Sequence, residues 1–275
     1  MNIMEDKRNQ KEIKYLYRYQ PFNGYSKDIF LDNKLYFACP SEFNDPFDCK
    51  ALFSLTDIDE KDFRIFLTRL FENRCPNIPR DAVIQKVDET IKKGFCWDIN
   101  WLRKHGEKFR EILEMEVSKL GVLCLSEKQD DILMWSHYAD KHKGFVLQFD
   151  KSRIDSWRYC SPVIYQGQYP TFKEFIPLIH RLDLHKLFLL RKSKHWDYEH
   201  EWRVIIDLGD EFNNEERRKI KFPENVMTGV IFGCQMQDLD RGRIRLWLKD
   251  KMENIKLYQA VKKEDEFALK IEPIE

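Results

Sequence analysis

The decapeptide KHWDYEHEWR, which begins at Lys194, combines more ionisable and aromatic groups than any other stretch. It is followed directly by the apolar run VIIDL. If a strand begins at Tyr198, alternation places Glu199, Glu201 and Arg203 on one face. Two such carboxylates repel each other unless a cation or a substrate lies between them, and Lys194 and Arg203 are the candidate cations. A partly buried pair would be a functional site, and the alternative is an ordinary surface salt-bridge cluster.

A second stretch, YLYRYQPF, predicts a strand over 15–19. Tyr17 lies on one face of this strand, and Arg18 lies on the other face beside Leu16. An arginine among apolar neighbours requires an acidic or phosphate partner, because an unpaired buried charge is costly. Arg18 is therefore either a phosphate ligand or one half of a structural salt bridge.

The turn SEFNDPFDC holds three further polar candidates, Asn44, Asp45 and Asp48. Asx side chains cap their own backbone in such turns, and we expect this role for Asn44 at least. Asp45 and Asp48 are alternatively placed to hold Arg18 or a substrate hydroxyl.

The segment LCLSEKQDDILMWSHYADKH predicts a strand that ends at Ser126, followed by a helix. Trp135 and Tyr138 are three residues apart and share one face of that helix. Large aromatic residues on a helix beside a sheet are usually part of the core. The other interpretation is a pocket wall, next to Ser126, that receives a planar ring.

Composition excludes several classes of protein. The 275 residues carry 47 basic and 47 acidic side chains, so no global field attracts nucleic acid or an anionic membrane. No run approaches the roughly 18 apolar residues of a membrane span, and the charged start is not a secretory signal. The seven cysteines include no C-x-x-C pair, which predicts a reducing cytoplasm and core thiols at Cys124 and Cys234. Histidines five apart do not share a helical face, so no metal is expected.

The order of elements predicts an α+β fold in a single domain, 1–275. Strand patterns occur in VLCLSE, GFVLQFD, WRVIIDL and TGVIFGCQ, and a helix is expected over 171–192. A helical block over 57–120 interrupts the strands as an insertion or subdomain, and residues 255–275 predict a C-terminal β-hairpin. Because strands and helices do not alternate regularly, we expect a mixed or antiparallel sheet.

Four motifs, together with a final strand VIFGC, resemble a bacterial family known as domain of unknown function 2971. They are LYRYQPFN, LYFACPSEFNDPFDC, VLCLSEKQDDILMWSHYADKHKGFVLQFD and KHWDYEHEWRVI. The resemblance covers residues 15–235 and names no reaction.

A more distant resemblance connects the chain to ADP-ribosyltransferases of the Arg-Ser-Glu class. The order is an arginine on a first strand, Arg18, a serine ending a middle strand, Ser126, and E-x-E opening a later strand. This resemblance implies that Glu201 is the catalytic glutamate and that Glu199 contacts the acceptor. The class has Ser-Thr-Ser where this chain has Leu-Ser-Glu.

The implied function is an NAD-dependent ADP-ribosyltransferase or NAD glycohydrolase, with a role in bacterial or phage defence suggested by such proteins generally. NAD would be the substrate, and the acceptor would be protein or nucleic acid. Arg18 would bind the pyrophosphate, Trp135 or Tyr138 would stack on the nicotinamide or adenine ring, and Tyr17 and Ser126 would be further binding residues. Two alternatives remain: a non-enzymatic module that binds a nucleotide or a partner, and a nuclease in which Asp45, Asp48 and the two glutamates gather Mg²⁺.

Overall fold

The computed structural model describes residues 13–54, 59–93, 110–111, 113–176, 184–251 and 253–274. Parts of two predicted elements, the helical block over 57–120 and the helix over 171–192, lie outside these ranges. By its internal contacts the chain divides into two compact units. We call them the sheet unit (Met1–Ala38, Gly121–Val163, Asp197–Glu275) and the helical unit (Cys39–Leu120, Ile164–Trp196).

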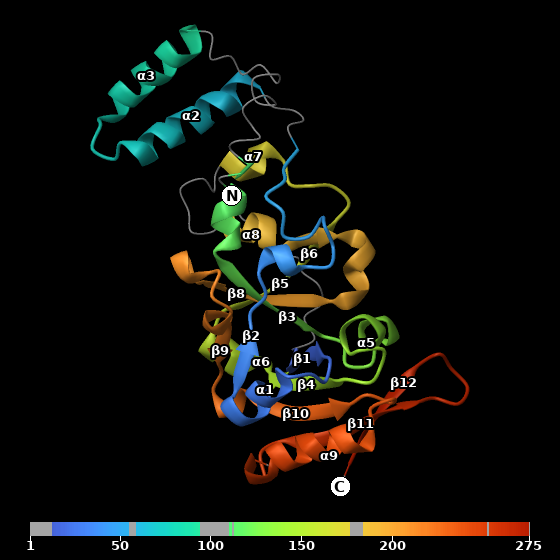
Figure 1. Ribbon diagram of the computed structural model, residues 1–275. Helices are drawn as coiled ribbons and strands as arrows, with labels where there is room; N and C mark the ends of the chain where they lie inside the picture. The colour runs from blue at the N-terminus through green and yellow to red at the C-terminus, as the bar shows by residue number, and fades with distance from the viewer. Residues whose placement is uncertain are drawn as a thin grey trace. The chain divides into compact units, whose positions relative to one another are not determined.

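The sheet unit is built on eight strands in the order β12-β11-β10-β4-β1-β3-β8-β5 (Figure 1). Strands β10 and β11 run parallel. Four other pairs are antiparallel: β1 with β4, β4 with β10, β11 with β12, and β5 with β8. The prediction of an α+β fold with a mostly antiparallel sheet is confirmed. The strands are β1 (Tyr15–Gln20), β3 (Leu120–Ser126), β4 (Phe145–Asp150), β5 (Cys160–Pro162), β8 (Glu201–Asp207), β10 (Met227–Phe232), β11 (Lys256–Lys262) and β12 (Leu269–Pro273).

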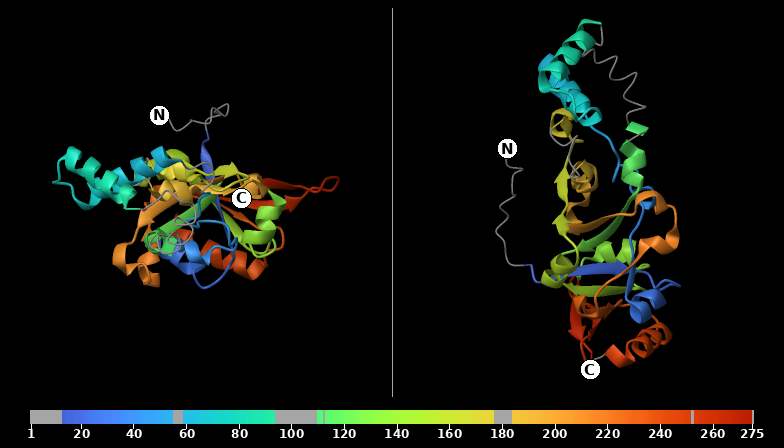
Figure 2. Two further views of the ribbon diagram at one scale, coloured as in Figure 1. Left: turned by 90° about the horizontal axis from the view of Figure 1, so that it is seen from above. Right: turned by 90° about the vertical axis from the view of Figure 1, so that its left-hand side faces the viewer.

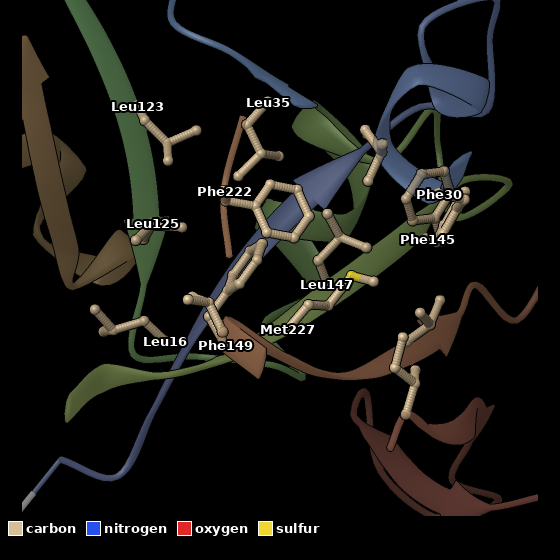
Figure 3. Packing of buried hydrophobic residues seen from close by; sticks show 14 of the residues in the cluster. Leu16, Phe30, Leu35, Leu123, Leu125, Phe145, Leu147, Phe149, Phe222 and Met227 are labelled. Carbon is tan, nitrogen blue, oxygen red and sulfur yellow. The ribbon is translucent and has the colours of Figure 1, made fainter. Parts of the chain in front are cut away.

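Alternation along these strands divides the buried side chains between the two faces. On β4, Phe145, Leu147 and Phe149 enter the larger apolar cluster, and Val146 enters the smaller one. Figure 3 shows the larger cluster, which Leu16 of β1 joins. Helices α1 (Ser26–Asp32), α6 (Lys151–Trp157) and α9 (Asp238–Trp247) contribute side chains to the larger cluster, and α5 (Ile132–Tyr138) contributes to the smaller.

A separate two-stranded sheet of the sheet unit joins β2 (Lys34–Tyr36) to β9 (Lys219–Lys221). The fully buried side chain of Leu35 on β2 packs in the larger cluster. This small sheet therefore extends the same apolar core.

The helical unit contains α2 (Glu60–Arg74), α3 (Arg80–Lys92), α7 (Phe172–Phe175) and α8 (Leu184–Leu189). Asp59 caps α2, because its carboxylate accepts a hydrogen bond from the backbone N–H of Asp62. Strands β6 (Ile164–Gln166) and β7 (Arg191–Ser193) pair parallel. The expected helix over 171–192 is therefore wrong at its end, where the chain is extended. None of the helices in the described ranges has the length and apolar character that a membrane crossing requires.

Candidate functional site

The strand that carries the E-x-E motif begins later than the sequence predicts. Lys194–Glu199 form a 3-10 helix, His200 takes a left-handed conformation with φ 44°, and β8 begins at Glu201. A non-glycine residue with positive φ interrupts both helix and strand. Glu199 and Glu201 therefore do not share the face of one strand, which corrects that prediction.

Glu201 forms a buried, bidentate ion pair with Arg203, which lies two residues further along β8. Arg203 Nε lies 2.7 Å from Glu201 Oε1, and Arg203 Nη2 lies 2.9 Å from Glu201 Oε2. Arg203 is 1 % exposed and Glu201 is 4 % exposed. Such charge-assisted, bidentate bonds are among the strongest that side chains make. Arg203 thus satisfies the expectation of a cation beside the glutamate, and it fixes the direction of both carboxylate oxygens.

Arg18 of β1 brings a second guanidinium into the surroundings of this pair. Its Nη1 donates to the carbonyl oxygen of Cys124 at 2.8 Å, whereas its Nε is buried and has no hydrogen-bond partner within the described residues. Burial lowers the pKa of Arg18, and the attraction of Cys124 and Glu201 opposes that shift. The charges of Arg18 and Glu201 thus interact, beside the closer contact that Glu201 makes with Arg203.

Cys124 of β3 is a member of this cluster that the sequence analysis assigned to the core. Its thiol lies near enough to Glu201 for the carboxylate charge to affect the pKa of the thiol. Burial raises the pKa of the thiol, the negative charge of Glu201 raises it further, and Arg203 and Arg18 oppose the increase. The signal that was missed is the spacing of two between Cys124 and Ser126, which places both on one side of a strand.

Ser126 and Tyr138 hold the segment of Glu199 in place. Ser126 Oγ donates to the carbonyl oxygen of Glu199 at 2.6 Å and accepts from the backbone N–H of Lys128 at 2.9 Å. Tyr138 Oη donates to Glu199 Oε1 at 2.7 Å. Ser126 is 1 % exposed and Glu199 is 2 % exposed. The serine therefore acts on the turn before β8, and its hydroxyl is occupied by the protein itself.

The other two aromatic candidates lie in the smaller apolar cluster. Trp135 is fully buried, its ring centroid lies 5.5 Å from that of Tyr19, and its indole N–H donates to Gln129 O at 2.9 Å. Tyr17 is 7 % exposed, and its hydroxyl accepts from Gln148 Nε2 at 3.4 Å. Tyr138, which is half-buried, is the aromatic residue that contacts the E-x-E segment.

The remaining polar candidates belong to the helical unit. Asp45 caps its own turn, because its carboxylate accepts from the backbone N–H of Phe47 at 2.9 Å. Asp48, 2 % exposed, lies 3.6 Å from Nζ of Lys192, and that Nζ lies 5.1 Å from the ring centroid of Trp196. Lys192 was not foreseen as a site residue, because its neighbours in sequence indicated a helix. Asn44 and Lys194 are both exposed.

Within the described ranges, no three His, Cys, Asp or Glu side chains gather in the way that metal ligands do. Residues 134–204 match the family described as "Protein of unknown function (DUF2971)". The match supports the expected family resemblance over α5 and the start of β8, and it does not extend to Arg18 or Ser126. Neither the curated proteins nor the solved structures contain a match to this chain.

Proposed function

We propose that this chain cleaves the bond between nicotinamide and ribose in NAD, and transfers ADP-ribose to an acceptor or to water. The observation that supports this proposal is the meeting of Arg18, Glu201 and Arg203 from strands β1 and β8, which only β3 separates in the sheet. An arginine, a serine and a glutamate on those three strands are also the residues that the resemblance to ADP-ribosyltransferases implies.

In this proposal Arg18 binds the diphosphate of NAD. Its guanidinium makes one hydrogen bond within the described residues, to Cys124 O, and it has a buried Nε without a partner. A planar guanidinium suits phosphate oxygens because it presents several donors in a fixed fork.

Glu201 stabilises the positive charge that develops on the ribose. As the glycosidic bond breaks, nicotinamide leaves with the bonding electrons, and the anomeric centre becomes oxocarbenium-like. Arg203 fixes the direction of the carboxylate through its two hydrogen bonds. The acceptor hydroxyl then adds to the anomeric carbon, and Glu199, which Tyr138 orients, receives its proton.

The tightness of the Glu201–Arg203 pair supports a second candidate. A carboxylate that is 4 % exposed and held by two bonds to arginine is also suited to a permanent structural role. In that case Arg18 would still bind an anionic nucleotide, and the chain would be a binding module without chemistry.

One experiment separates the two functions. Purified protein is incubated with NAD, nicotinamide release is followed by chromatography, and binding of NAD is measured by calorimetry. The enzymatic function is supported if the wild type releases nicotinamide and Glu201→Asp does not. Aspartate retains the negative charge beside Arg203, but its shorter side chain moves the carboxylate away from the ribose. Glu211→Gln, at an exposed site, is the control that should remain active. Binding without release supports the binding module, and no binding at millimolar NAD overturns both.

A further inference from the structure

Strand β12 forms one edge of the eight-stranded sheet, with β11 as its neighbour among the described strands. The backbone N–H of Lys263 donates to Ala268 O, and that of Ile274 donates to Leu257 O. In an antiparallel ladder the direction of the backbone groups alternates with each residue. The residues of β12 whose backbone groups point away from β11 are therefore Leu269, Ile271 and Pro273.

We propose that this edge pairs with β12 of a second copy of the chain, antiparallel and centred on Ile271. A two-fold axis through Ile271 places Lys270 of each copy opposite Glu272 of the other. Both side chains are exposed, and within one chain Lys270 Nζ lies 2.7 Å from Glu272 Oε1, so both project from the same face. Opposite charges at facing positions stabilise paired strands. The strand is thus complementary in charge to itself.

The sequence of β12 allows this register and disfavours its neighbours. A centre at Pro273 would place two residues without N–H groups opposite each other, which removes the central hydrogen bonds. A centre at Leu269 would place Glu272 of one copy opposite Glu266 of the other, which is a repulsive contact. Charged residues and proline are the features that limit open-ended pairing of edge strands. In the register centred on Ile271, Pro273 faces Leu269 of the other copy and cannot donate a hydrogen bond there, so pairing is confined to the centre of the strand and does not continue into an extended assembly.

The same register brings the tip of the hairpin to a cationic hollow of the second copy. The β11–β12 hairpin extends away from the rest of its sheet, as the red ribbon shows in Figure 1 and in the left view of Figure 2. Its tip carries a fully exposed Phe267 next to the acidic run Glu264–Glu266. Ala268 of one copy faces Ile274 of the other, so Phe267 continues toward the side chains that surround Ile274.

Ile274 lines a hollow of about 430 Å³ beside α9, together with Asp238, Arg241, Gly242, Arg245 and Gln259. Asp238 forms an ion pair with Arg241, so Arg245 accounts for the positive charge of the hollow. Arg241 Nη1 donates to Gln259 Oε1 at 2.7 Å, which fixes its guanidinium at the rim. Gly242 leaves open space, because a Cβ there would meet no atom within 4 Å. The chain's own tip is separated from this hollow by the length of β12, about 17 Å at 3.4 Å per residue. An acidic, aromatic tip and a basic, partly apolar hollow thus match between two copies.

The test measures self-association of the full chain by sedimentation velocity across the micromolar range. The wild type is expected to form a dimer that weakens with added salt. Lys270→Glu and Glu272→Lys each place like charges at two facing positions and should raise the dissociation constant roughly tenfold or more. An equimolar mixture of the two variants restores opposite charges at every facing position, and it should recover the dimer as a heterodimer.

A second pair of variants tests the backbone contact. Ile271→Pro removes an N–H that points away from β11, so it should abolish the dimer and leave the hairpin paired. Ile271→Val keeps the N–H and is the matched control that should remain dimeric. A wild type that stays monomeric over the whole range, a dimer that tolerates Lys270→Glu, or a mixture that fails to associate would each overturn the proposal.

Discussion

The two units each bury an ion pair, and the two pairs differ in geometry. In the sheet unit, Arg203 meets both oxygens of Glu201 at 2.7 and 2.9 Å. In the helical unit, Lys192 Nζ lies 3.6 Å from Asp48, beyond normal hydrogen-bond distance, and 5.1 Å from the Trp196 ring. The side chains are buried to a similar degree. The exposed fraction is 0 % for Arg203 and 5 % for Glu201, and it is 5 % for Lys192 and 1 % for Asp48. The arginine meets both oxygens of its carboxylate, whereas the lysine ammonium lies further from Asp48 Oδ2.

Removing the carboxylate charge of the tighter pair should have the largest effect. Glu201→Gln removes the charge of the carboxylate that the 1 % exposed Arg203 binds at both oxygens, and a broken buried pair typically costs about 3–5 kcal/mol. The free energy of unfolding, measured in urea, should fall by that amount. Glu211→Gln, at an exposed pair with Arg217, should change it by no more than about 0.5 kcal/mol. A loss below about 1 kcal/mol in Glu201→Gln would remove the contrast between the units.

The looser pair should tolerate a comparable deletion better. Lys192→Met leaves Asp48 buried but removes a contact already longer than a hydrogen bond, so we expect a loss of about 2 kcal/mol. Lys194→Met, at an exposed lysine two residues further, is the matched control and should be nearly neutral. Equal losses in Lys192→Met and Glu201→Gln would show that geometry does not distinguish the two pairs.

Sequence patterns predicted the strands better than the turns between them. The alternation of YLYRY and GFVLQFD gave β1 and β4, because one face of each strand is apolar and the pattern is local. The start of β8 was misplaced by three residues, because the positive φ of His200 has no signature in a sequence without glycine there. The helix over 171–192 failed at Arg191, because the pairing of β7 with the distant β6 overrides the local helical preference.

The sequence pointed to some residues of the candidate site and missed both Cys124 and the contacts that its residues make. Arg203 was foreseen as a cation for the glutamates, since it lies two residues from Glu201 in one strand. The assignment of Tyr138 Oη to Glu199 and of the Cys124 thiol to Glu201 depends on the order in which the strands lie side by side. That order joins segments far apart in the chain, and no local pattern encodes it.

The thiol beside the tighter pair should make stability depend on alkaline pH. Because the pKa of Cys124 is raised in the folded state, its contribution is complete below the unfolded value of about 8.5 and is lost as pH rises above it. Each pH unit above that value costs about 1.4 kcal/mol. The free energies of unfolding of the wild type and Cys124→Ala should therefore approach each other by this amount per pH unit between pH 8 and pH 10. Parallel curves would contradict the raised pKa of the buried thiol.

The smallest effect on stability should come from Arg18, and it should have the opposite sign. Burial lowers the pKa of Arg18 despite the attraction of Cys124 and Glu201, so its charge opposes folding. Its buried Nε also lacks a hydrogen-bond partner among the described residues. Arg18→Met removes both costs, keeps a similar length and leaves Glu201 neutralised by Arg203. We expect the free energy of unfolding in urea to rise by up to about 1 kcal/mol.

The same variant separates a structural arginine from a ligand-binding one. If Arg18 binds the diphosphate, Arg18→Met gains stability and loses NAD binding, which is the pattern of a residue kept for function at the expense of the fold. Arg203→Met is the contrasting variant: it leaves Glu201 without its bidentate partner and should lose stability. A loss of stability in Arg18→Met as large as that in Arg203→Met would make Arg18 an equal partner in the ion pair, and stability would then explain its presence without a ligand.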